Sequence, residues 1–253
     1  MTDRWRVFAN LATLANALVG VGAVLYVLAG NKLWAMFLIA AGIGFDGMDG
    51  LFSRRSPSPS GAFGRVADSI ADAITFGLAP ALLLVVHRED ASVWAPWSLV
   101  ALVVGGAYFA LAVGRLIYYT GWGFERAHFL GVPTPQSALA VSVLVLFFDV
   151  PAFASPQPVV VLLVAPLVAA LMAVPIPFPK IRRGSPLRPW STATAIGLAL
   201  ALLILQFRPA SGSGLYDLAL AAAGVGTVGV LAYYLGGPLT ADRRRSATGG
   251  QAE

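Results

Sequence analysis

The sequence predicts an all-helical membrane protein, a bundle of about eight transmembrane helices with both termini in the cytoplasm. Composition, the length of the apolar runs and the distribution of basic residues all support this fold class. Of the 253 residues, 58% are hydrophobic and only 11% are charged, and the mean hydropathy is +0.77. Such values are typical of polytopic membrane proteins. We expect one integral membrane domain over residues 1–240 and a polar cytoplasmic tail over 241–253.

Each predicted transmembrane helix is an apolar run of about the 20 residues that cross a bilayer. The first run is longer than the apolar part of a cleavable signal peptide, so we expect it to remain as a helix. The fifth and sixth runs are short and proline-rich sequence separates them, which also fits one broken hairpin. The eight runs cover residues 7–29, 33–54, 62–87, 93–119, 134–150, 157–174, 190–207 and 213–235.

The basic residues indicate how these helices are oriented. With a cytoplasmic N-terminus, only Lys32, Arg88 and Arg208 of the 17 Lys and Arg residues fall outside, and the other 14 fall inside. Cytoplasmic segments are enriched in basic residues, and an even number of spans brings both basic termini to one side. The sequence therefore predicts a multi-pass protein of the cell membrane. The net charge of +5 then reflects orientation and anionic lipid rather than nucleic-acid binding.

The residue types that are missing or rare exclude several kinds of site. The chain has no cysteine, which excludes disulfides, thiolate catalysis and cysteine-ligated zinc. His87 and His128 are its only histidines, too few for a histidine-rich metal site. Oxygen ligands must therefore hold any metal ion.

Four aspartates stand in sequence that is otherwise apolar enough to cross a membrane. Asp46 and Asp49 are three residues apart and Asp68 and Asp72 are four apart, so each pair shares one helical face and the two pairs could face each other. Carboxylates at this depth are costly unless they bind a cation or line a wet cavity, which favours a functional site. The predicted topology places all four at the cytoplasmic ends of the second and third runs.

Residues around the aspartates favour a phosphate ligand. Carboxylate oxygens suit Mg²⁺ or Mn²⁺, and two opposed pairs supply ligands for one or two ions beside substrate phosphates. Gly50 and Gly64 allow the backbone to approach a ligand closely. Arg54 and Arg55 offer guanidinium groups to phosphate oxygens. This combination indicates a site for a nucleotide diphosphate or a lipid pyrophosphate.

The same run resembles the signature of the CDP-alcohol phosphatidyltransferase family, D-x2-D-G-x2-A-R-x8-G-x3-D-x3-D. The matching positions are Asp46, Asp49, Gly50, Arg54, Gly64, Asp68 and Asp72. Ser53 stands where the family usually has Ala, and nine residues rather than eight separate Arg54 from Gly64. Either the connecting loop is one residue longer, or Arg55 takes the role of the motif arginine.

The resemblance implies that an alcohol attacks a CDP-activated lipid and that CMP leaves. It implies that two ions, Mg²⁺ or Mn²⁺, are bound by Asp46, Asp49 and Asp68, with Asp72 beside the metals as an additional ligand and as the general base. It further implies that the CDP-lipid lies against this run. The residues expected to contact that lipid are Gly50, Ser53, Arg54, Arg55, Gly64 and Asp68.

The stretch AITFGLAPALL after Asp72 resembles the S-F-G-x-A-P-A stretch of the phosphatidylserine synthase branch, as does the eight-span count. This resemblance implies L-serine as the acceptor, CDP-diacylglycerol or its archaeal ether analogue as the donor, and a homodimer. The carboxylate of serine needs a cation, for which the candidates are Arg115, Lys180, Arg182 and Arg183. The alternative role of these basic residues is to set the orientation of the helices in the membrane and to contact anionic lipid. Asn16 fits either a polar pocket or a hydrogen bond between helices.

Other functions fit parts of the pattern. Glycerol 3-phosphate or an inositol phosphate could be the acceptor in the same chemistry, although a phosphorylated acceptor requires a denser cationic pocket. A membrane prenyltransferase also uses Asp-rich motifs, but in widely separated segments. A cation transporter would distribute acidic residues over several spans, whereas these four lie in one short helix-loop-helix.

Overall fold

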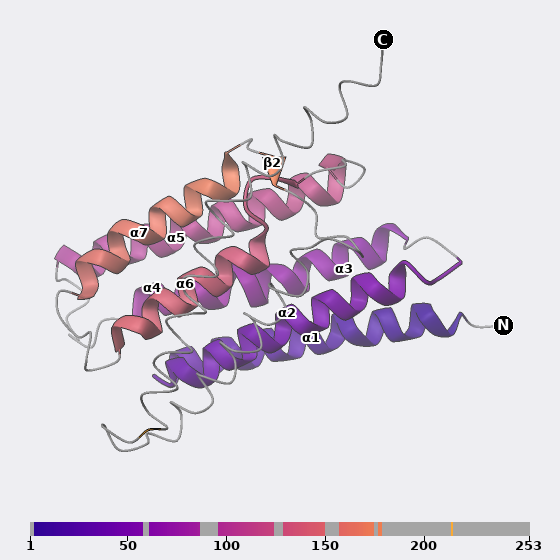
Figure 1. Ribbon diagram of the computed structural model, residues 1–253, viewed down its shortest axis with the longest axis horizontal. Coiled ribbons are helices and arrows are strands. Elements are labelled where there is room, and N and C mark those ends of the chain that lie inside the picture. The colour runs from indigo at the N-terminus through magenta and orange to yellow at the C-terminus, as the bar shows by residue number, and fades with distance from the viewer. Residues whose placement is uncertain are drawn as a thin grey trace, which may run out of the picture. The chain divides into compact units, whose positions relative to one another are not determined.

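A computed structural model describes residues 3–57, 61–86, 96–123, 129–149, 157–174 and 177–178, together with Gly214 (Figure 1). Residues 1–125 and 134–172 form one compact unit, and residues 126–133 and 173–253 form a second. In the second unit, the two-residue strands β1 (Phe129–Leu130) and β2 (Pro177–Phe178) pair in antiparallel register. The other described elements are helices, in agreement with the predicted all-helical class.

The first two helices form an antiparallel pair with a tight turn between them (Figure 1). Helix α1 (Arg4–Leu28) begins after Asp3, whose carboxylate accepts a hydrogen bond from the backbone N–H of Trp5. Helix α2 (Lys32–Ser53) begins after Asn31, whose side chain accepts from the N–H of Trp34 at 3.3 Å. Between them Gly30 has a φ of 75°, a left-handed conformation that favours glycine.

The third apolar run contains a π-helix. Helix α3 (Ala62–Asp72) continues into η1 (Ala73–Leu78), a π-helix of six residues, and then into α4 (Ala79–Val86). Thr75 of η1 is fully buried where this run crosses α1 and α2. A Cβ atom at Gly20 would lie 2.2 Å from Thr75 Oγ1, and one at Gly42 would lie 2.4 Å from Thr75 Cγ2. The crossing therefore depends on glycine at both positions, as small residues allow membrane helices to approach closely.

The remaining described helices complete an apolar core in the first unit. They are α5 (Pro96–Tyr118), the short π-helix η2 (Tyr119–Gly123), α6 (Thr134–Asp149) and α7 (Gln157–Ala173). Tyr108 of α5 is fully buried, and its hydroxyl donates to the carbonyl of Phe76 in η1 at 3.0 Å. This bond satisfies two polar groups inside the core. Val141 of α6 and Val161 of α7 belong to the same buried cluster as Tyr108.

Four described helices are long and apolar enough to cross a membrane: Arg4–Leu28, Lys32–Ser53, Ala62–Val86 and Ser98–Gly121. Helices α6 and α7 are shorter apolar helices. Leu18 and Leu25 of α1 are 64% and 61% exposed in the isolated chain, as expected for side chains that contact lipid. These features support a membrane-embedded protein. The first six predicted runs coincide with described helices, whereas the runs at 190–207 and 213–235 and the tail at 241–253 lie outside the described residues.

Candidate functional site

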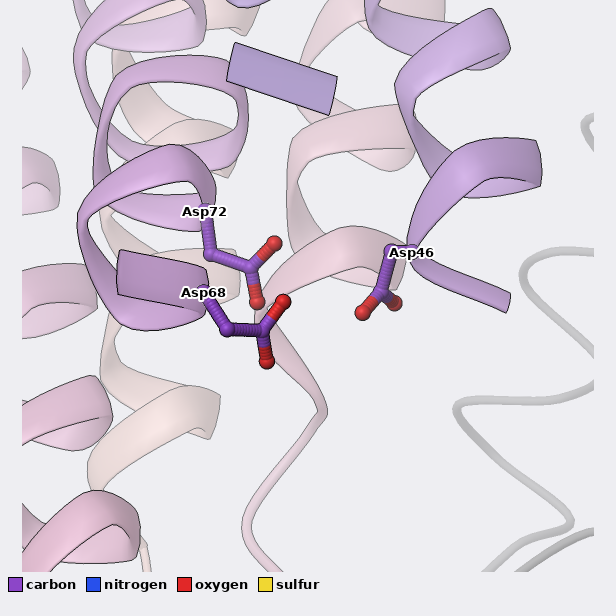
Figure 2. Close-up of side chains that lie close together, drawn as sticks. All are labelled: Asp46, Asp68 and Asp72. Carbon is purple, nitrogen blue, oxygen red and sulfur yellow. The ribbon is translucent and has the colours of Figure 1, made fainter. Parts of the chain in front are cut away.

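Three of the four aspartates converge from two helices. One carboxylate oxygen each from Asp46 on α2 and from Asp68 and Asp72 on α3 all lie within 4.8 Å of one another. Figure 2 shows the carboxyl groups of Asp68 and Asp72 next to each other, with that of Asp46 opposite them. The spacing of four residues on α3 puts its two carboxylates on one face, which is turned toward α2. We refer to these three residues as the carboxylate cluster.

The fourth aspartate adjoins the carboxylate cluster. The side chain of Asp49, one turn after Asp46 on α2, contacts that of Asp68. It also accepts a hydrogen bond from the hydroxyl of Thr13 on α1. Asp72 is the most buried of the four and is 8% exposed, while the others are half-buried. The two pairs predicted to face each other therefore do so.

The carboxylate cluster has the ligands and spacing for a hard divalent cation. Four carboxylates this close repel one another strongly in a partly buried site. Asp68 Oδ1 is buried and has no hydrogen-bond partner among the described residues, so it is available as a ligand. Two oxygens on opposite sides of Mg²⁺ are about 4.2 Å apart, close to the 4.8 Å spread of the cluster. These residues thus fit an oxygen-ligated ion.

The two adjacent arginines point to different places. The guanidinium group of Arg54 lies against Gly50, with Nη1 3.2 Å from where a Cβ atom would stand, and its positive charge acts on Asp46. The guanidinium carbon of Arg55 lies 5.3 Å from the ring centroid of Trp5, near the start of α1. Arg54 is therefore the arginine on the aspartate side. Of the other residues expected at the lipid, Ser53 ends α2 and Gly64 lies in the first turn of α3, both half-buried.

Helix α1 contributes side chains whose role was not apparent from the sequence. The amide nitrogen Nδ2 of Asn16, which is fully buried, donates to Asp72 Oδ1 at 2.8 Å. From the sequence, Asn16 had no assigned partner and Thr13 was not singled out. Two polar residues three apart in an apolar helix share a face, and this was the one signal available.

Only one of the four candidate acceptor cations lies within the described residues. Arg115, in the last turn of α5, is half-buried, and its Nη1 donates to Thr134 Oγ1 on α6 at 3.0 Å. Its guanidinium carbon lies 4.5 Å from the ring centroid of Tyr119. A hydrogen bond between the hydroxyls of Ser69 and Thr120 joins α3 to η2, which follows α5 directly. The other three candidates, Lys180, Arg182 and Arg183, lie outside the described residues.

Curated proteins with similar sequences have closely related names. The chain is 32% identical over 143 residues to the CDP-diacylglycerol–serine O-phosphatidyltransferase of Mycobacterium tuberculosis, which covers 54% of this chain and 48% of the relative. It is 29% identical over 141 residues to the enzyme of that name from Helicobacter pylori, with 55% and 57% covered. It is 27% identical over 134 residues to the archaetidylserine synthase of Methanothermobacter thermautotrophicus, with 53% and 55% covered.

These matches span about half the length of each relative. No solved structure gives a significant match. The family model described as CDP-alcohol phosphatidyltransferase matches residues 6–178, which include the whole carboxylate cluster and more than half of the chain. The chain therefore belongs to the CDP-alcohol phosphatidyltransferase family.

Proposed function

We propose that this chain transfers a phosphatidyl or archaetidyl group from a CDP-activated lipid to L-serine, in a metal-dependent reaction that releases CMP. The observation that carries the proposal is the carboxylate cluster, which brings together aspartates from α2 and α3 inside the family match. The acceptor is proposed from the relatives, whose names all describe enzymes that make a serine lipid. The donor is CDP-diacylglycerol or its archaeal ether analogue.

The proposed metal ligands are the carboxylate cluster and Asp49, which together would hold two ions, Mg²⁺ or Mn²⁺. Bound divalent ions neutralise a pyrophosphate and stabilise the charge that develops as it is displaced. Arg54 supports phosphate oxygens of the CDP-lipid from the side of Gly50. We propose Ser53 and Gly64 as further lipid contacts, because Ser53 ends α2 and Gly64 lies in the first turn of α3, the two helices that carry the aspartates.

Asp72 is the proposed general base. Asn16 occupies its Oδ1, which leaves Oδ2 to accept the proton of the serine hydroxyl. As that proton moves to Asp72, the serine oxygen forms a bond to the phosphorus on the lipid side of the pyrophosphate. The bond between this phosphorus and the oxygen bridging to the second phosphorus breaks, and CMP leaves with both electrons of that bond. A positioned base accelerates such a step by about 10²–10⁴-fold.

The proposed setting is a single domain over residues 1–240 with eight spans and cytoplasmic termini, so that the aspartates lie at the cytoplasmic face of the cell membrane. The distribution of basic residues supports this orientation. The family match includes residues of both compact units, which supports one functional domain. A homodimer is proposed from the family resemblance alone.

A panel of acceptors tests the proposal. Detergent-purified protein with CDP-diacylglycerol, Mn²⁺ or Mg²⁺ and L-serine is expected to release CMP, and a chelator is expected to stop it. Release with glycerol 3-phosphate or an inositol phosphate, but not with serine, would reassign the acceptor. An absence of CMP with every alcohol and with both CDP-lipids would overturn the transferase function, and prenyl transfer and ion flux would then be measured in its place.

We propose that Arg115 binds the serine carboxylate, because it is a half-buried cation on the helix joined to α3 through η2. Arg115→Gln is expected to raise the KM for serine about 10- to 100-fold, since a hydrogen bond to a charged group is lost. The KM for CDP-lipid should stay within about twofold. Lys32→Gln, at the start of α2, is the charge-matched control. An unchanged KM for serine would contradict the assignment.

A further inference from the structure

Two donors on α1 each contact one aspartate of a different pair. The hydroxyl of Thr13 donates to Asp49 on α2, and the amide of Asn16 donates to Asp72 on α3 at 2.8 Å. Thr13 and Asn16 are three residues apart, so they share one face of α1. That face is turned toward both helices that carry the aspartates.

Stability alone does not account for Asn16. Its side chain is fully buried, yet its Oδ1 has no hydrogen-bond partner among the described residues. A buried polar atom without a partner costs free energy, and an apolar side chain at position 16 would avoid that cost only by leaving Asp72 Oδ1 without this donor. The donor of the amide, rather than its oxygen, therefore indicates the role of Asn16.

The surroundings of Asn16 hold the amide in one orientation. A Cβ atom at Gly42 would lie 2.9 Å from Asn16 Oδ1, so α2 packs directly on the oxygen side of the amide. An ionised Asp72 can only accept, which assigns the nitrogen of the amide to the side of Asp72. One oxygen of Asp72 is thus engaged and the other is left for the reaction.

We propose that Asn16 and Thr13 are positioning residues of the aspartate site. Asn16 holds Oδ1 of Asp72, so that this carboxylate presents a single oxygen to the acceptor hydroxyl rather than turning both oxygens to a cation. Thr13 fixes Asp49 from the same helix. The inference rests on the proposed transferase function and extends it to α1, a helix that bears none of the four aspartates.

The test replaces Asn16 by leucine, which has a similar branched shape and no donor. In the purified full chain, Asn16→Leu is expected to lower kcat for serine-dependent CMP release by about tenfold or more. The KM for CDP-lipid is expected to stay within about twofold. The rise in melting temperature caused by Mn²⁺ alone should persist, because the carboxylate cluster is intact. A wild-type kcat, or loss of the Mn²⁺ effect together with kcat, would overturn the positioning role.

A matched control distinguishes positioning from packing. Thr75→Val removes a buried hydrogen bond to the backbone of Asn16 at the same helix crossing, but no donor to an aspartate. Its kcat should stay within about threefold of wild type. A loss as large as that of Asn16→Leu would assign the effect to packing and overturn the inference.

Conservative variants of Thr13 test the second residue of the proposal. Thr13→Val keeps the shape but loses the hydroxyl and is expected to lower kcat, while Thr13→Ser keeps the donor and is expected to restore most of it. Equal activity of the two variants would remove Thr13 from the proposal. Wild-type protein that releases no CMP refutes the transferase function itself, whereas active wild type with equally active Asn16→Leu refutes only the inference.

Discussion

Asp72→Asn is expected to lower serine-dependent CMP release about a hundredfold or more while leaving Mn²⁺ binding largely intact. The substitution keeps the shape of the side chain, and its amide oxygen can still accept the hydrogen bond from Asn16. An amide cannot take the proton of the incoming hydroxyl, so the chemical step is the one affected. The other three aspartates, which are the other proposed cation ligands, remain in place. CMP release and the thermal shift produced by Mn²⁺ measure the two properties separately.

Two further variants make this result specific. Asp3→Asn, at the N-cap of α1, removes a carboxylate that is not one of the four aspartates, keeps an oxygen that can cap the helix, and should leave turnover unchanged. Asp68→Asn should instead raise the Mn²⁺ concentration needed for half-maximal activity, because it removes a proposed ligand whose Oδ1 has no hydrogen-bond partner among the described residues. Wild-type turnover in Asp72→Asn would exclude Asp72 as the base.

Gly42→Ala is expected to destabilise the protein and to lower its turnover. The added Cβ atom would lie 2.4 Å from Thr75 Cγ2 and 2.9 Å from Asn16 Oδ1, both on fully buried residues. Overpacking of this kind costs about 1–3 kcal/mol, or roughly 2–12 °C in melting temperature. Because relief of the clash moves Asn16 or η1 away from α2, turnover should also fall. Thermal unfolding and CMP release on the same preparation measure both losses.

The control is two residues further along the same helix. A Cβ atom at Gly44 has nothing within 4 Å, and alanine is favoured over glycine in a helix by about 1 kcal/mol. Gly44→Ala should therefore melt at the same temperature as wild type or slightly higher. If Gly42→Ala and Gly44→Ala behave alike, the close crossing at Thr75 does not limit stability.

Local sequence patterns were sufficient to single out the four aspartates as a candidate site and to predict the first six helices. Charged residues in apolar sequence are conspicuous, and spacings of three and four determine a shared face without knowledge of the fold. Apolar runs of about 20 residues likewise predict membrane helices without knowledge of the fold. The facing of Asp46 toward Asp68 and Asp72 could be expected from the short connection between the second and third runs. Their individual roles remain proposals.

Features that depend on contacts distant in sequence were not predictable. The hydrogen-bond partner of Asn16 lies 56 residues away. The sequence therefore shows a polar residue in an apolar helix but does not show which residue it contacts. The choice between Arg54 and Arg55 depends on the position of the Trp5 ring, which the signature does not contain. The π-helix η1 is stabilised partly by contacts from other helices, including the bond from Tyr108 to Phe76, and hydrophobic periodicity does not reveal it.

The π-helix η1 has a consequence for how the third span can change in evolution or design. A π-helix closes i→i+5 hydrogen bonds and shifts the phase of the residues that follow it relative to those before it. The continuous helix formed by α3, η1 and α4 can thus place Asp68 and Asp72 in the carboxylate cluster. The same helix places Leu83 and Leu84 in buried apolar clusters, without a hinge between the two halves. Deleting a single residue from 73–78 would restore α-helical hydrogen bonding and rotate α4 relative to α3 by about 100°. The span would then keep its length and hydrophobicity but lose the alignment of one of its two faces.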